Sequence, residues 1–165
     1  MRVYIPATLP MLRELIDDGF LQPRGGTAFA VTPALREAYA EGDDEELAEI
    51  ALGEAALASI RLLSADSDGG LPVRRAVVVA DADKTTLRPD LDDAVVRVGG
   101  RIAMDQVAAV YVDNADAEPA VKAAIEVIDE ADFGDEDAEL TVGDAQDHAL
   151  AWYATQEIPF LLDLL

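Results

Sequence analysis

The chain has 165 residues and carries 34 acidic against 12 basic side chains, which gives a formal net charge of −22, while 51% of its residues are hydrophobic. This charge repels nucleic-acid phosphates and anionic membrane surfaces, because binding to either depends on Lys and Arg. We therefore expect neither a nucleic acid nor a membrane as a partner. The absence of cysteine excludes disulfides, thiolate metal sites and thiol nucleophiles.

Length and hydrophobicity favour one compact domain over residues 1–165. The apolar fraction is too high for a disordered acidic chain. Residues 1–10 lack the continuous apolar run of a secretory signal, and no segment approaches the ~20 apolar residues of a membrane span. We expect a cytoplasmic protein.

The first third of the chain contains two strand-and-helix units. Residues 2–6 are short, β-branched and aromatic, which predicts a strand, and Thr8 caps a helix that reaches about Asp18. Residues 27–31 predict a second strand, after which Thr32 caps a helix with proline at its first position. Both helices therefore begin with the same local chemistry.

The strongest helix prediction covers residues 44–64, where acidic residues fill the first turns and apolar residues leave only a narrow polar stripe. This pattern predicts a mostly buried helix. Gly53 lies in its middle and costs about 1 kcal/mol relative to alanine, which suggests a close backbone contact there.

The middle of the chain supplies interior strands. Residues 75–80, 94–98 and 107–112 are rich in valine, which is typical of strands buried inside a sheet. A helix is predicted over about residues 118–130, because Pro119 suits a first turn.

Two interpretations are open for the tail. Residues 138–142 and 149–154 alternate in polarity and predict a hairpin, whereas residues 144–152 also fit a helix. Pro159 then begins a short apolar helix. The sequence predicts an α+β fold, a single domain in which strand-helix units form a mixed sheet and the C-terminal hairpin packs on helices.

The chemical motifs are few. The sequence contains no Gly-x-Ser-x-Gly elbow, no Gly-x4-Gly-Lys-Ser/Thr loop and no dinucleotide-binding glycine pattern, and we expect no cofactor. His148 is the sole histidine and the candidate for acid–base catalysis, with the carboxylate of Asp147 beside it. A structural role for this histidine is the alternative.

Carboxylates follow two of the predicted interior strands, and these are Asp81, Asp83, Asp113 and Asp116. If the two strand ends are adjacent and parallel, the side chains meet and could bind a divalent cation. The alternative is that aspartate is simply common where strands end and helices begin.

Arg74 and Arg75 form the sole pair of adjacent basic residues and could clamp one carboxylate or phosphate. With the aromatic Trp152 and Tyr153 they are the candidate ligand-binding residues. The C-terminal residues 158–165 contain six large apolar side chains, which predicts docking in cis, a protein partner or self-association.

Four segments together resemble a small actinobacterial family of unknown function across the whole chain: RVYIPAT (2–8), AFAVTPAL (28–35), AVYVD (109–113) and DHALAWYATQEI (147–158). This resemblance implies no activity, cofactor or catalytic residue. We expect a cytoplasmic, acidic interaction or regulatory domain. The alternative is an enzyme, either a metal-assisted hydrolase using the four aspartates or an acid–base enzyme around His148.

Overall fold

A computed structural model describes residues 1–66 and 70–165. Single-turn 3-10 helices, labelled η, stand between several of the larger elements. The elements in chain order are β1 (Arg2–Ala7), α1 (Leu9–Asp18), β2 (Phe20–Leu21), η1 (Arg24–Gly26), β3 (Thr27–Phe29), α2 (Pro33–Ala38), α3 (Asp44–Ala65), β4 (Ala76–Asp81), β5 (Thr85–Leu87), β6 (Val95–Val98), β7 (Ile102–Ala103), η2 (Met104–Gln106), β8 (Val107–Val112), η3 (Ala115–Ala117), α4 (Glu118–Asp132), α5 (Glu136–Gln146), β9 (Ala151–Ala154), η4 (Thr155–Glu157) and α6 (Ile158–Asp163).

Seven strands form one sheet in the order β5-β6-β3-β1-β4-β8-β9, and β2 pairs with β7 in a separate ribbon. The α+β class is confirmed. The sheet is antiparallel at each neighbouring pair of strands. Neighbouring strands therefore run in opposite directions, so the end of one lies beside the start of the next. This decides which strand-end residues can meet.

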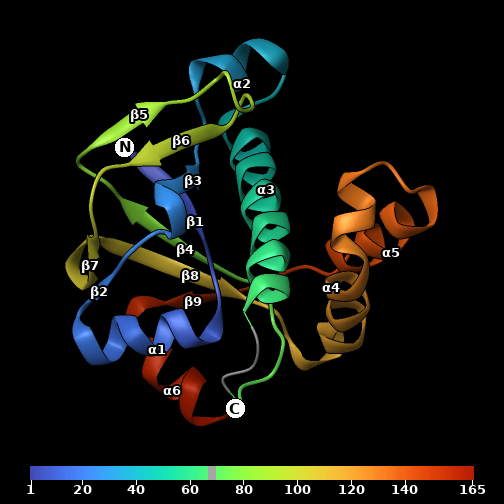
Figure 1. Cartoon of the computed structure of the whole chain (residues 1–165). Coiled ribbons are helices and arrows are strands. Elements are labelled where there is room, and N and C mark those ends of the chain that lie inside the picture. The colour runs from blue at the N-terminus through green and yellow to red at the C-terminus, as the bar shows by residue number, and fades with distance from the viewer. Residues whose placement is uncertain (67–69) are drawn as a thin grey trace.

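Helices cover both faces of the sheet (Figure 1). On one face, α1, α6 and the β2–β7 ribbon enclose the largest core cluster, and on the other face α3 encloses a second. The helices α4 and α5 pack against α3 in a third cluster. Alternation along β1 divides its side chains, so that Val3 and Ile5 enter the first core while Tyr4 packs against the second.

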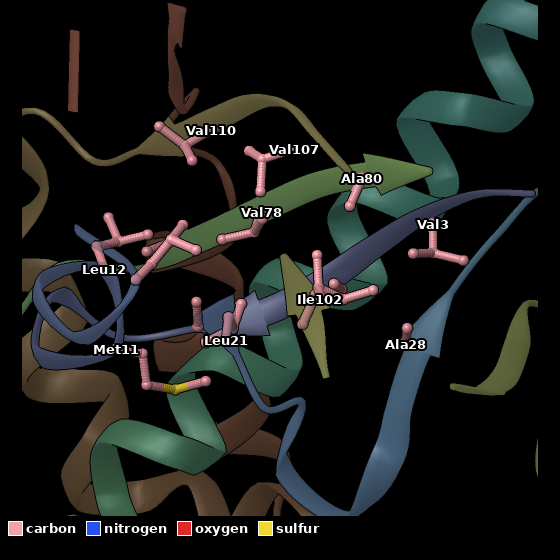
Figure 2. Packing of buried hydrophobic residues seen from close by; sticks show 14 of the residues in the cluster. Val3, Met11, Leu12, Leu21, Ala28, Val78, Ala80, Ile102, Val107 and Val110 are labelled. Carbon is pink, nitrogen blue, oxygen red and sulfur yellow. The ribbon is translucent and has the colours of Figure 1, made fainter. Parts of the chain in front are cut away.

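The first core is built mainly from aliphatic side chains (Figure 2). Leu12 of α1, Val78 of β4 and Ile102 of β7 pack together there and are almost fully buried. Burying such a side chain stabilises the fold by about 1.5–3 kcal/mol. The small β2–β7 ribbon thus seals this face beside α1.

The predicted helix caps are confirmed. The Thr8 hydroxyl accepts a hydrogen bond from the Met11 backbone N–H at 3.4 Å, and Thr32 does the same for Leu35 at 3.1 Å. Asp43 caps α3 by accepting from the Glu46 N–H at 2.9 Å. Each cap satisfies an N–H that has no partner inside its helix.

Helix α3 confirms the helix predicted for residues 44–64, but it is buried along one side rather than mostly buried. The role expected for Gly53 is wrong. A Cβ at this position would meet no atom within 4 Å, so no neighbouring backbone requires a glycine. The Gly53 carbonyl instead accepts a hydrogen bond from Gln146 Nε2 at 3.0 Å. This bond fastens α3 to the end of α5.

The predicted C-terminal hairpin is wrong. Residues 138–142 lie in α5, where Asp135 caps the helix by accepting from the Ala138 N–H at 2.9 Å. Ala138 and Val142 recur at helical spacing and are buried, whereas Leu140 is 70% exposed. The strand predicted at the end of the tail is present as β9, but its partner is β8.

In the part of the chain that the structure describes, no helix is both long and apolar enough to span a membrane.

Candidate functional site

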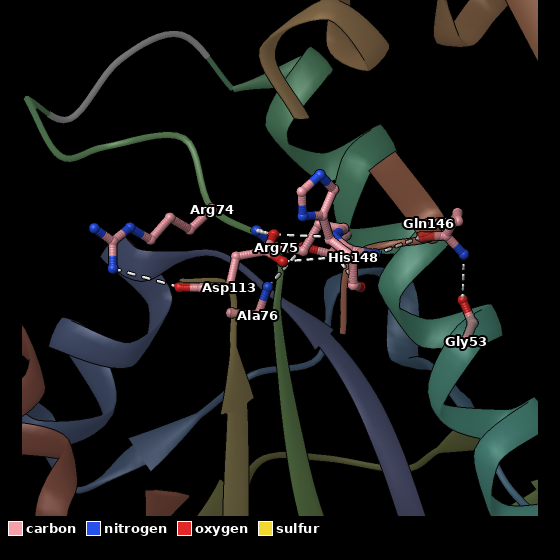
Figure 3. Close-up of polar contacts among 8 residues, drawn as sticks. Gly53, Arg74, Arg75, Ala76, Asp113, Gln146 and His148 are labelled. Atoms are coloured by element: carbon pink, nitrogen blue, oxygen red, sulfur yellow. Dashed lines mark hydrogen bonds and ion pairs between the residues drawn. The ribbon is translucent and has the colours of Figure 1, made fainter. Parts of the chain in front are cut away.

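A buried ion pair joins the neighbouring interior strands β4 and β8 where β4 begins and β8 ends (Figure 3). Arg75 precedes β4, Asp113 follows β8, and both side chains are almost completely buried. Arg75 Nη2 donates to Asp113 Oδ1 at 2.6 Å, and Nε donates to Oδ2 at 2.9 Å. The Arg75 backbone N–H also donates to Oδ2, at 2.7 Å.

The remaining donors of the Arg75 guanidinium extend this network. Nη1 donates to Gln146 Oε1 at 2.9 Å, and Nη2 donates to the His148 carbonyl at 2.7 Å. Because Gln146 in turn donates to Gly53, one arginine connects the sheet to the end of α5, to α3 and to the segment that leads into β9. Among the described residues no buried side-chain nitrogen or oxygen lacks a partner.

Arg74 is the other half of the predicted basic pair. Its Nε and Nη2 donate to Glu118 Oε2 at 3.1 and 2.9 Å, and Nη1 lies 3.4 Å from the Asp113 carbonyl. Both arginines therefore clamp carboxylates, as arginine geometry favours, but the carboxylates belong to this chain. The two arginines therefore hold the start of β4 to the end of β8 and to the start of α4.

The four candidate metal ligands are not brought together. Because β4 and β8 are antiparallel, Asp113 lies beside the start of β4, whereas Asp81 lies at the far end of that strand. The prediction of a shared cation site required parallel strands and is wrong. Asp81 binds Arg2 at 2.9 Å, and this hydrogen bond lowers the pKa of Asp81. Asp83 and Asp116 are exposed. No group of three or more potential ligands occurs among residues 1–66 and 70–165.

His148 lies between α5 and β9 and is partly exposed. It contributes its backbone carbonyl to the buried network, accepting from Arg75, while Figure 3 shows the imidazole directed away from Gln146. The surrounding geometry thus uses the backbone of this residue to fix the start of β9.

Trp152 and Tyr153 project to opposite faces of the sheet. Trp152 lies opposite Tyr111 on the face covered by α3, and it is 57% exposed. Tyr153 lies opposite Val110 and packs against the first core. Burial raises the pKa of Tyr4, and nearby Tyr111 adds to the shift. This face of the sheet therefore carries two partly buried tyrosines, and the exposed indole of Trp152 lies beside Tyr111.

Strand β9 is an outer strand of the sheet. The Ala154 N–H donates to Glu157 Oε1 at 2.9 Å and so points away from β8. Because backbone direction alternates along a strand, the N–H and C=O of Trp152 also point outward. The outward N–H of Ala154 is thus capped by the Glu157 side chain. The outward position at Trp152 presents a backbone donor, a backbone acceptor and a large aromatic ring.

The C-terminal segment folds back in cis as α6. Ile158, Leu161 and Leu162 are buried in the first core beside α1, whereas Phe160 and Leu164 are exposed. The predicted short helix after Pro159 is confirmed. Its apolar residues therefore divide between a docked face and an outward face.

Sequence reasoning missed the buried pair Arg75–Asp113. The available signal was position: each charged residue directly adjoins an apolar run that predicts a buried strand. A charge in such surroundings must be paired, because an isolated buried ion is too costly. Which partner it takes depends on strand pairing that the sequence does not display.

The fold and the buried network around Arg75 and Asp113 define a small, acidic α+β domain with an antiparallel seven-stranded sheet. The chain belongs to a family of unknown function, DUF6912, which it matches over residues 1–162. Comparisons with curated proteins and with solved structures give no match.

Proposed function

We propose that the protein is a cytoplasmic, non-enzymatic interaction domain that binds an extended, basic segment of a protein partner along the outer edge of β9. The observation that carries this proposal is an uncharged outer strand with an exposed tryptophan, Ala151–Ala154, on a chain of net charge −22. An outer strand presents backbone donors and acceptors that an added strand can satisfy.

The opposite edge of the sheet makes the contrast clear. There β5 is bounded by Lys84 and Arg88, and Pro89 follows directly. Charged residues and proline next to an outer strand are the usual protection against unwanted pairing. Neither strand contains a charge or a proline itself, but the charges that flank β9 are acidic rather than basic, so β9 is the outer strand that attracts a basic segment.

Carboxylates frame β9 at both ends. Because Val112 pairs with Ala151, the exposed Asp116 that follows β8 and Asp147 that precedes β9 belong to the same end of this strand pair. The exposed Asp105 and Glu157 belong to the other end, where β8 begins and β9 stops. This charge favours a partner strand with lysine or arginine and disfavours a second copy of the same acidic chain.

The enzyme alternatives receive less support. The four aspartates are separated, and His148 enters the buried network through its backbone.

The test uses Trp152, which is the chain's sole tryptophan and therefore reports directly on β9. A synthetic peptide that alternates Lys and Val is titrated into the full chain while indole emission and acrylamide quenching are followed. We expect a blue shift, protection from quenching and weaker binding at 0.5 M salt, because the framing carboxylates are screened. A peptide that alternates Glu and Val should leave the emission unchanged.

Two matched variants complete the test. Trp152→Ala should weaken binding of the lysine peptide by at least about tenfold, as removal of a central aromatic contact does, when binding is followed by calorimetry. Phe133→Ala removes a 92% exposed aromatic ring from the turn between α4 and α5 and should leave binding unchanged. No binding of the lysine peptide, or equal loss in both variants, overturns the proposal. A blue shift that grows with protein concentration alone assigns β9 to self-association and overturns the basic partner.

A further inference from the structure

A cavity of about 270 Å³ lies between α3 and the β1–β3 part of the sheet. Its sheet side is formed by Pro6, Thr27 and Phe29, and its helix side by Ala58 and Leu62. These side chains are apolar apart from one hydroxyl. The volume is close to the lower end of known ligand sites, about 300 Å³, which fits a ligand no larger than a single ring or a short branched chain.

Two arginines line the same cavity, Arg24 from η1 and Arg61 from α3. Arg24 Nη1 and Nη2 donate to Asp66 at 3.3 and 2.9 Å, and Arg61 Nε and Nη2 donate to Asp132 at 2.9 Å each. A guanidinium has five N–H donors, so each of these bidentate pairs occupies two and leaves three. Both cations therefore retain hydrogen-bonding capacity for a further anion.

The backbone around Arg24 holds it over the cavity. Gly25 and Gly26 both have positive φ, of 63° and 72°. A Cβ on Gly26 would lie 3.0 Å from the Val98 carbonyl oxygen, so this turn requires glycine for space as well as for conformation. Arg24 thus extends from a turn with a fixed path, and Arg61 from the last third of a long helix.

The local charge balance favours this cavity over most of the surface. The two arginines and their two aspartates sum to zero formal charge, and Glu54, which interacts with Arg61, adds one negative charge, within a chain of net charge −22. A small anion is repelled by most of the molecule but meets two guanidinium groups here, with an apolar surface beside them. The site lies apart from β9, because β4 and β8 stand between β1 and that strand.

We propose that this cavity binds a small organic carboxylate, with its aromatic or branched apolar group against Pro6, Phe29 and Leu62 and its carboxylate between Arg24 and Arg61. This binding function is additional to the proposed strand surface and does not depend on it.

Benzoate serves as the probe, with benzamide as its neutral isostere and phenyl phosphate as a second anion. Binding to the full chain is measured by saturation-transfer NMR and calorimetry at low salt. We expect benzoate to bind at least about tenfold more tightly than benzamide, because only the anion forms charge-assisted hydrogen bonds with the arginines. Equal binding of benzamide and benzoate, or no binding of benzoate at 10 mM, overturns the proposal. Tenfold tighter binding of phenyl phosphate overturns the carboxylate assignment.

Variants locate the binding. Arg24→Gln and Arg61→Gln should each weaken benzoate by about tenfold, whereas Arg88→Gln should not, although Arg88 forms a similar bidentate pair with Asp90. Ala58→Leu fills the cavity without changing charge and should also abolish binding. Melting curves establish that each variant is folded. Benzoate affinity that is unchanged in Arg24→Gln, Arg61→Gln and Ala58→Leu places the probe elsewhere and overturns the site.

Discussion

Arg75 and Asp113 are held together by two side-chain hydrogen bonds, Nη2 to Oδ1 at 2.6 Å and Nε to Oδ2 at 2.9 Å, with both side chains almost entirely withdrawn from water. The pair joins residues 38 positions apart and fixes where β4 begins relative to where β8 ends. The attraction within such a pair is offset by the cost of removing both charges from water. Removing one partner therefore lowers the free energy of unfolding most, because the other charge stays buried without a partner.

Breaking this pair from one side should therefore be severe. We expect Asp113→Asn and Arg75→Met each to lower the free energy of unfolding by about 3–5 kcal/mol, because each leaves an uncompensated buried charge. Urea unfolding at pH 7 measures the change. The exposed pair Arg2–Asp81 is the control, and Arg2→Met should cost no more than about 1 kcal/mol.

Removing both charges separates the contact from the burial cost. The double variant Arg75→Met with Asp113→Leu should be much less destabilised than the sum of its single variants, because neither charge remains buried. Additive losses would mean that the two side chains stabilise the fold through separate contacts.

A second prediction concerns pH. Burial raises the pKa of Glu54 and the charge of Asp92 raises it further, while Arg61 opposes both. A carboxyl whose folded pKa is raised contributes stability fully below its unfolded pKa, here 4.5, and loses it as pH rises through the folded pKa. Glu54→Gln should therefore raise the free energy of unfolding at pH 7, and with it the melting temperature, by less than about 1 kcal/mol since the side chain is partly exposed.

The same comparison at pH 4 supplies the control for Glu54. Wild-type Glu54 is then largely protonated, so the advantage of Glu54→Gln should disappear. A stabilisation that is equal at both pH values would show that ionisation of this carboxyl is not its cause.

Net charge leads to a third prediction. With −22 charges on 165 residues, repulsion between surface carboxylates opposes the compact state, and salt screens it because the Debye length is about 10 Å at 0.1 M. We expect the melting temperature to rise between low salt and about 0.5 M NaCl, measured by calorimetry at pH 7. A flat profile would mean that self-repulsion contributes little to stability.

The elements that the sequence predicts well are those whose signals are local. Thr8, Thr32 and Asp43 cap helices through hydrogen bonds to residues three positions away, so their chemistry is readable within a single turn. The alternating polarity of residues 138–142 suggested a strand, but Ala138 and Val142 also lie at helical spacing, and the cap that begins the helix, Asp135, lies outside that segment.

The site could not be predicted in the same way, because it depends on pairing between distant strands. Asp81 and Asp113 are equivalent in sequence, since each ends an apolar strand, yet the antiparallel pairing puts one on the surface with Arg2 and the other in the interior with Arg75. The cavity between Arg24 and Arg61 likewise combines a turn and a helix that meet only in the folded chain.

The final prediction concerns the C-terminal helix α6, where neighbouring leucines occupy different surroundings. Leu162 is buried in the first core, and Leu164 is 85% exposed. Leu162→Ala should lower the free energy of unfolding by about 2–5 kcal/mol, because it leaves a cavity beside α1. Leu164→Ala should change it by less than about 0.5 kcal/mol, since an exposed apolar side chain stabilises little.

Deletion of residues 159–165 distinguishes docking in cis from association in trans. Because Leu161 and Leu162 pack into their own domain, we expect the deletion to lower the melting temperature independently of protein concentration, as followed by calorimetry over a hundredfold concentration range. Light scattering on the full chain and the deleted chain measures the oligomeric state beside it. A dimer that becomes a monomer on deletion, and in Phe160→Ala with unchanged stability, would instead assign the outward face of α6 to a second copy.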